Sequence, residues 1–161
     1  MKFNVEIKEI INAEDKSLIC NGILRALPNW FGIEESIVEY VAGVRDKPFF
    51  CFTNNNTAAG FVSILPHNAH TAEIYVMGIL ESFHRQGIGQ KLVELCETYC
   101  RTNHMSFLTV KTLSESHPDP YYKKTRLFYE AMGFKPLEVF PTLWGEECPC
   151  LFLGKYIGHR R

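Results

Sequence analysis

The sequence lacks a long apolar run and a strong excess of either charge. Its 161 residues include 17 Lys and Arg against 18 Asp and Glu, which gives a formal net charge of −1. Domains that bind nucleic acid are usually strongly basic, so we expect no nucleic-acid partner. No stretch approaches the roughly 18 apolar residues that a membrane-spanning helix needs. Segment 1–10 alternates apolar and charged residues, unlike a secretory signal, and we therefore expect a cytoplasmic protein without a membrane partner.

The sequence also lacks the common metal-binding spacings. Neither a CxxC pair nor an HExxH pattern is present among its six cysteines and six histidines. The simpler interpretation is that the cysteines are buried thiols. The alternative is a metal site formed by Cys148 and Cys150 with His104 or His117. Without a secretory signal, we expect the cysteines to be reduced and the protein to bind no metal.

The remaining composition is that of one globular domain. Hydrophobic residues make up 46%, which is enough for a sizeable core, and 161 residues suit a single domain over 1–161. We find no internal repeat and no linker.

Apolar periodicity predicts a mixed α/β order of elements. The order is β-α-α-β-β-β-α-β-α-β-β, with strands over 3–7, 49–53, 60–65, 72–80, 107–112, 138–140 and 151–156, and helices over 15–26, 33–42, from 87–89 onward, and 124–132. Leu18, Ile19, Gly22, Ile23 and Ala26 form the expected apolar stripe of the first helix. In the third helix, Glu97 is expected off the buried stripe. The pattern predicts one main sheet.

A glycine-containing loop connects the strand at 72–80 to the next helix. It reads His84-Arg85-Gln86-Gly87-Ile88-Gly89. Glycines allow a tight turn and close approach of a ligand, and the N–H groups and dipole of a helix start attract anions. The alternative is a simple strand-to-helix turn. A Rossmann motif would need a third glycine, and a P-loop would need Lys-Ser/Thr where Gln90 follows Gly89.

Two segments carry a family resemblance. IYVMGILESFHRQGIGQKLVELCE (74–97) resembles the cofactor motif of the GCN5-related N-acetyltransferases, the GNAT superfamily, and LFYEAMGFKPLE (127–138) resembles its next helical segment. The resemblance implies an α+β fold with a mixed, mainly antiparallel central sheet flanked by helices. It also implies an enzyme that moves an acetyl group from acetyl-CoA to a primary amine by direct attack in a ternary complex. His84 departs from the usual Arg or Gln, and Tyr122 and Thr125 stand where Asn and Ala are common.

The resemblance places the cofactor on one continuous segment. The backbone of Ile79 and Leu80 would run beside the pantetheine arm, and an N–H near Ile79 would stabilise the oxyanion. The pyrophosphate contacts would come from His84, Arg85, Gln86, Gly87, Ile88, Gly89 and Gln90, with Phe128 as a further cofactor contact. In this arrangement His84 and Arg85 reinforce the anion site.

Two residues are candidates for the acid–base chemistry. Glu73 is the candidate general base, because an amine must lose a proton before it attacks; the alternative is an exposed charge on a strand. Tyr129 matches the family tyrosine that protonates the leaving thiolate, and a phenol is still protonated at neutral pH. The alternative for Tyr129 is an aromatic side chain packed beside Phe128.

The acceptor site is the least defined part of the sequence. Candidate residues are Trp30, Tyr40, Tyr121 and Tyr122, together with Phe31, His117, Asp119 and Trp144. Aromatic rings and acids suit a cationic amine, but they equally suit a lid or a contact in a homodimer. We expect a small-molecule amine. The alternatives are a protein N-terminus or lysine as acceptor, or a non-catalytic acetyl-CoA sensor of the same fold.

Overall fold

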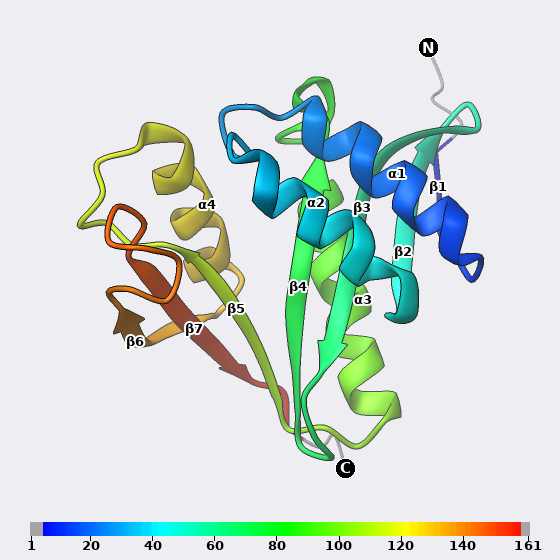
Figure 1. Cartoon of the computed structure of the whole chain (residues 1–161). Coiled ribbons are helices and arrows are strands. Elements are labelled where there is room, and N and C mark those ends of the chain that lie inside the picture. The colour runs from blue at the N-terminus through cyan, green and yellow to red at the C-terminus, as the bar shows by residue number, and fades with distance from the viewer. Residues whose placement is uncertain (1–4, 159–161) are drawn as a thin grey trace. The chain divides into compact units, whose positions relative to one another are not determined.

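The computed structural model describes residues 5–158. Its elements follow one another as β1 (Val5–Glu9), α1 (Ala13–Arg25), α2 (Glu34–Gly43), η1 (Val44–Asp46), β2 (Phe49–Asn54), β3 (Thr57–Pro66), β4 (Thr71–Ile79), η2 (Glu81–Phe83), α3 (Ile88–Thr102), β5 (Phe107–Leu113), α4 (Pro120–Ala131), β6 (Lys135–Phe140) and β7 (Cys150–Tyr156) (Figure 1). The predicted order of helices and strands is confirmed. The two short 3₁₀ helices, η1 and η2, were not predicted, and Phe3 lies outside the described residues.

The strands form one seven-stranded sheet in the order β1-β2-β3-β4-β5-β7-β6. Strand pairs β1/β2, β2/β3, β5/β7 and β6/β7 are antiparallel. The ladder of β4 with β5 is parallel and runs from Thr71↔Phe107 to Ile74↔Val110. The mixed, mainly antiparallel sheet and the α+β class are therefore confirmed. The position of β7 between β5 and β6 depends on long-range pairing that no local pattern shows.

The chain divides into two compact units. The first contains the described residues of Met1–Leu65 and Tyr75–Cys96, and the second contains Pro66–Ile74 and those of Glu97–Arg161. Both β4 and α3 contribute residues to each unit. A single domain over the whole chain stays a prediction.

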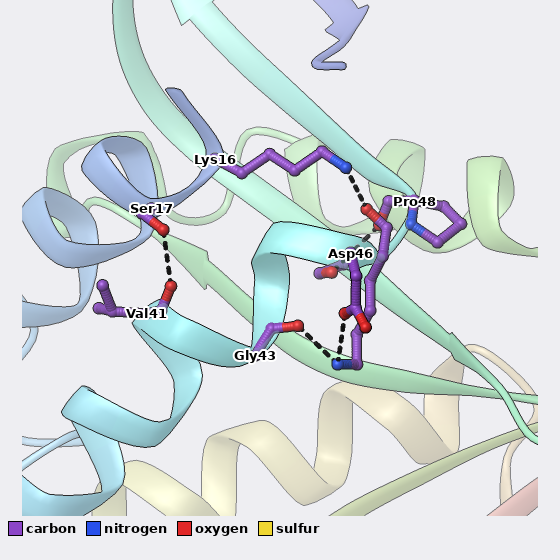
Figure 2. A network of polar contacts seen from close by, with 8 residues as sticks. Lys16, Ser17, Val41, Gly43, Asp46 and Pro48 are labelled. Atoms are coloured by element: carbon purple, nitrogen blue, oxygen red, sulfur yellow. Dashed lines mark hydrogen bonds and ion pairs between the residues drawn. The ribbon is translucent and has the colours of Figure 1, made fainter. Parts of the chain in front are cut away.

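Helix α1 buries only part of the expected stripe: Ile23 is buried as predicted, whereas Gly22 and Ala26 are exposed. Its buried residues are Lys16, Ser17, Cys20, Ile23 and Leu24, whereas Leu18 is 68% exposed, so its place in the apolar stripe was wrong. Two of these buried residues, Lys16 and Ser17, are polar, and each donates a hydrogen bond to a carbonyl group. Lys16 Nζ donates to the carbonyl of Lys47 at 2.7 Å, and Ser17 Oγ donates to that of Val41 at 2.8 Å (Figure 2). Satisfying these carbonyls offsets the cost of burying polar groups.

The end of α2 is held by a cation. Lys47 Nζ donates to the Gly43 carbonyl at 2.5 Å, as Figure 2 shows, and an ammonium group at a helix C-terminus is favourable. Phe49 and Phe61 belong to the core of the first unit, and their rings stack with centroids 5.0 Å apart. Fully burying such a side chain contributes roughly 1.5–3 kcal/mol. Helices α1 and α2 lie side by side in Figure 1 and are tied together through these contacts.

In the second unit, α4 begins one turn earlier than predicted. The helix starts at Pro120 rather than Lys124. Asp119 caps it, because its side chain accepts from the N–H groups of Tyr121 and Tyr122. Proline is favourable at the first helical position, where its missing N–H has no intrahelical partner to lose.

Two further expectations can be checked on buried side chains. All six cysteines are free thiols, as predicted, and only Cys148 is not fully buried. Glu97 was expected off the buried stripe of α3 but is buried, because it forms an ion pair with Lys155. Within residues 5–158, no helix combines the length and apolar character needed to cross a bilayer.

Candidate functional site

The loop between η2 and α3 has the backbone of an anion cradle. Arg85 and Gly87 both adopt left-handed conformations, with φ of 62° and 80°. Left-handed residues turn successive N–H groups toward one concave side, and the start of α3 follows at Ile88. A Cβ added at Gly87 would meet no atom within 4 Å, so the space beside this backbone is open to a ligand.

His84 does not extend its side chain toward this cradle. Its Nε2 lies 2.6 Å from the carbonyl oxygen of Ile79, at the end of β4. Since a carbonyl only accepts, Nε2 carries the proton of this bond. The His84 ring also makes an edge contact with Trp30, with centroids 5.4 Å apart. The side chain therefore links the loop to β4 and to the α1–α2 connection.

Arg85 is the cationic side chain that remains for an anion in this loop. It is exposed, and no ion pair joins it to another residue of the described range 5–158. The two glutamines bond within their own segments: Gln86 Nε2 donates to the Ser82 carbonyl at 3.0 Å, and Gln90 Nε2 donates to Glu94 at 3.0 Å. The anion site would thus consist of backbone N–H groups and one guanidinium.

The end of β4 is partly committed to other bonds. The Leu80 N–H donates to the Ala59 carbonyl at 2.9 Å, and the Ile79 carbonyl accepts from His84. Ile88 is buried, which anchors the first turn of α3 in the first unit. Of the predicted pantetheine contacts, the Leu80 N–H is therefore used within the fold.

Glu73, in the second unit, belongs to a buried ion-pair cluster. Its side chain is only 6% exposed, so the interpretation as an exposed strand charge was wrong. Lys111 Nζ donates to both carboxylate oxygens, at 2.9 and 3.1 Å, and His67 Nε2 lies 2.7 Å from Oε1. The Lys111 ammonium group can only donate, and His67 donates from Nε2 when the carboxylate oxygen accepts. We call Glu73, Lys111 and His67 the ion-pair cluster.

Sequence reasoning missed two members of this cluster. Lys111 directly follows Val110, the last residue that β5 pairs with β4, and it is 38 positions from Glu73. His67 lies in the turn before β4, and its side chain is 39% exposed. The alternation of charged and apolar residues on β5 places Lys111 on one face of the strand but does not identify its partner.

The cluster also affects a neighbouring thiol. Burial raises the pKa of Cys150 to about 11, while Lys111 lowers this pKa and Glu73 raises it. The Lys111 ammonium lies 5.7 Å from the ring centroid of Phe152. This region thus contains a buried carboxylate and a partly exposed ammonium group of opposite charge that are paired with each other.

Tyr129 and Phe128 lie on α4 in the second unit. Tyr129 is buried, and its ring contacts Phe128 and Phe134 with centroids 5.2 and 5.5 Å apart. These contacts are typical of core packing, and they also fix the direction of the phenol. The acid role of Tyr129 and the cofactor contact of Phe128 stay predictions.

The candidate acceptor residues fall into both units. Trp30 and Tyr40 belong to the first unit and Tyr121 and Tyr122 to the second, all four half-buried. Burial raises the pKa of Tyr122 to about 12, with Asp119 and Cys148 adding to the shift. Asp119 was a candidate for binding an amine, but its carboxylate caps α4.

Metal ligands are not gathered anywhere in the part of the chain that the structure describes. No three side chains of His, Cys, Asp or Glu come together there in a group that could hold an ion. The candidate site consists of the glycine loop, with its open backbone, and the separate acid–base candidates.

Comparisons with known proteins place these features in a family. The sequence is 27% identical over 116 residues to an uncharacterised N-acetyltransferase of Chlorobaculum tepidum, covering 71% of this chain and 64% of that protein. The chain thus spans somewhat less than two-thirds of that relative.

Solved structures share the fold. A protein assigned to the GNAT acetyltransferases of Desulfovibrio desulfuricans superposes with a TM-score of 0.81 at 16% identity, over 96% of this chain and 99% of that one. An aminoglycoside 6′-N-acetyltransferase complexed with coenzyme A gives a TM-score of 0.73 at 18% identity, over 97% and 99%. At such identities the likeness concerns the fold alone. The sequence model of the acetyltransferase (GNAT) family matches residues 19–134, and the chain belongs to that family.

Proposed function

We propose that the protein transfers an acetyl group from acetyl-CoA to the primary amine of a small molecule, by direct attack in a ternary complex. Membership of the acetyltransferase family supports the reaction type. A coenzyme A complex and an aminoglycoside acceptor in a protein of the same fold support the donor and the kind of acceptor. The donor would supply a thioester that an amine can attack.

The observation that carries the proposal is the open, left-handed backbone at Arg85 and Gly87. A turn that only connected β4 to α3 would not need a left-handed arginine, which is strained relative to glycine. Here the strain coincides with free space beside Gly87 and with the start of a 15-residue helix. This combination suits a pyrophosphate group, because N–H groups and the helix dipole stabilise its charge without a metal ion.

In this proposal the side chains have separate tasks. Arg85 would pair with the phosphate charge, and His84 would hold the end of β4 in place. Tyr129 would donate a proton to the departing thiolate, and Glu73 would accept the proton of the amine, directly or through water. Lys111 and His67 already contact the Glu73 oxygens, so the amine or the water would have to reach an oxygen that has these partners.

Gly87→Trp tests the cofactor site. The indole would fill the space in which a phosphate must lie, so we expect acetyl-CoA binding measured by calorimetry to be lost. Gly145→Trp is the matched control, because Gly145 also has a positive φ, of 95°, and also has no atom within 4 Å of an added Cβ. Both variants share the cost of a left-handed side chain, and only Gly87→Trp should lose binding. Unchanged binding in Gly87→Trp would remove the loop from the site.

The acid role has its own test. In Tyr129→Phe we expect the turnover number for thiol release to fall by about tenfold or more. General acid catalysis contributes about 10²–10⁴-fold, and the expected loss is smaller because water can replace the phenol as proton donor. The dissociation constant of acetyl-CoA should change little. Full turnover would mean that Tyr129 is not the general acid and only packs in the core. Binding of acetyl-CoA without thiol release on any amine would favour a protein acceptor or a sensor instead.

A further inference from the structure

The first unit carries a series of half-buried aromatic side chains outside its core. Trp30 and Phe31 lie in the α1–α2 connection, Tyr40 on α2 and Tyr75 on β4. The ring centroids of Phe31 and Tyr40 are 6.2 Å apart, and those of Tyr40 and Tyr75 are 5.3 Å apart, both in edge-to-face geometry. We call these four residues the aromatic wall. Each of them packs against the apolar core.

The aromatic wall adjoins the glycine loop. Trp30, at one end of the wall, makes its edge contact with His84, the first residue of the loop. A small molecule bound against the wall would therefore lie next to the segment to which we assign the acetyl donor.

A positive charge already belongs to the wall. Lys47 Nζ lies 4.4 Å from the ring centroid of Tyr75, within the range of a cation–π interaction. The same ammonium donates to the Gly43 carbonyl and to Asp46 Oδ1, at 2.5 and 3.2 Å, so it is fixed by three partners. It uses the negative ring face of Tyr75 that a ligand cation would otherwise occupy.

Two of the nearby carboxylates already have a cationic partner. Glu34, at the start of α2, is held by both terminal nitrogens of Arg25 at 2.8 Å, and Asp46 is paired with Lys47. Glu39 is exposed on α2 next to Val38, on the side away from buried Ile37. A polycation needs several free carboxylates around it, and the wall presents rings and an ammonium instead.

We infer that the aromatic wall binds the acceptor and selects a primary amine with a single charge on an aromatic or apolar body, and that it disfavours polycations such as aminoglycosides. This inference rests on the proposed function, since it names the acceptor of the same reaction. The apolar body would pack against the half-buried rings of Trp30 and Tyr40. Its single amine would be directed away from Lys47.

Matched amines test the selectivity. With acetyl-CoA and the unmodified protein, we expect kcat/KM for thiol release to be at least about tenfold higher for 2-phenylethylamine than for 1,4-butanediamine. A second readout does not need turnover. The chain has two tryptophans, so in Trp144→Phe the fluorescence reports Trp30, and 2-phenylethylamine should quench it at lower concentration than the diamine.

Two variants separate ring contact from charge. Tyr40→Leu should raise KM for 2-phenylethylamine about tenfold and leave the affinity for acetyl-CoA unchanged, whereas Val38→Ala, 55% exposed on the same helix, should change neither. Lys47→Gln keeps a hydrogen-bond donor for Gly43 but removes the charge. It should raise kcat/KM for 1,4-butanediamine relative to 2-phenylethylamine.

The outcomes distinguish the inference from the function on which it rests. Acetyl-CoA binding with equal or better use of the diamine would overturn the inference and leave the proposed function standing. An unchanged Trp30 fluorescence with both amines would also overturn it. Loss of the inference together with the proposed function would show instead as no binding of acetyl-CoA to the unmodified protein.

Discussion

The glycine loop and the ion-pair cluster differ in whether their charged groups have partners within the protein. In the loop, Arg85 is exposed and the backbone N–H groups face open space beside Gly87. In the cluster, Glu73 is buried and both of its oxygens are bonded to Lys111. The loop lacks a negative partner that a ligand can supply, whereas the cluster contains its own.

This difference implies different consequences of mutation. A site that is completed by a ligand gains little folding free energy from its charged groups, so substitutions there should change binding more than stability. A buried ion pair leaves an uncompensated charge when one partner is removed, which is strongly destabilising. The predictions below compare the two regions on both quantities.

The largest expected effect is on the cluster. Lys111→Met leaves the Glu73 carboxylate buried with His67 as its remaining partner, and we expect the free energy of unfolding to fall by about 3 kcal/mol. The value lies at the lower end for a buried pair because the Lys111 side chain is 26% exposed. Urea unfolding followed by circular dichroism measures this change.

Two further variants show whether charge is the cause. In Glu73→Leu/Lys111→Met both charges are absent, so most of the lost stability should return. Arg25→Met breaks the exposed ion pair with Glu34 and should shift the urea midpoint far less. Equal losses for Lys111→Met and the double variant would mean that packing, not the unpaired charge, controls the stability of this region.

A substitution in the glycine loop should instead raise the free energy of unfolding. Arg85 adopts a φ of 62°, in which a side chain is strained by roughly 1–2 kcal/mol and glycine is not. Arg85→Gly should therefore unfold at slightly higher urea concentration, because the gain of about 1 kcal/mol exceeds the entropy that glycine adds to the unfolded chain. The same variant should bind acetyl-CoA about tenfold more weakly, since a phosphate contact is lost.

His104→Gly is the matched control for the loop. His104 has a φ of 58° and is exposed after α3, so the same substitution should relieve similar strain. It should raise the urea midpoint without changing the affinity for acetyl-CoA in calorimetry. A loss of affinity in both variants, or in neither, would separate the strained arginine from cofactor binding.

The two regions also differ in how far the sequence could predict them. The loop was found because glycine, helix start and strand end are neighbours along the chain, and local patterns carry that information. The pairing of Glu73 with Lys111 joins residues 38 positions apart, and it depends on the parallel register of β4 with β5. No single-sequence pattern fixes such a register, so the sequence left an exposed charge as the alternative for Glu73 and did not reveal the ion pair.

The same limit explains the errors in the fold. On α1, Lys16 and Ser17 replace Leu18 on the buried face because they bond to carbonyls of distant residues, which the apolar period does not reveal. On α3, Glu97 is buried because Lys155 pairs with it. The early start of α4 was visible in principle, since Asp119 before Pro120 is a favourable cap. Polar residues buried by long-range partners are what periodicity misses.

The smallest expected effect concerns buried thiols. They add to the comparison of the two regions a kind of group that is uncharged in the folded protein. Burial raises the pKa of Cys20 from 9.0 to about 12. Burial, together with Glu73, raises the pKa of Cys150 to about 11, while Lys111 opposes this shift. Since the folded pKa is the higher one, this stability is complete below about pH 9 and is lost as the pH rises toward 11–12.

Between pH 8 and pH 10 we expect each thiol to reduce the free energy of unfolding by about 1 kcal/mol, because only the unfolded chain releases the proton. Urea unfolding at both pH values measures the loss, and Cys20→Ala should flatten the pH dependence by one thiol's share. In Lys111→Met the pKa of Cys150 should rise further, while that of Cys20 should stay constant. A change at Cys20 in that variant would show that the ion-pair cluster influences charge beyond its own unit, and the contrast between a self-contained cluster and an open loop would then be wrong.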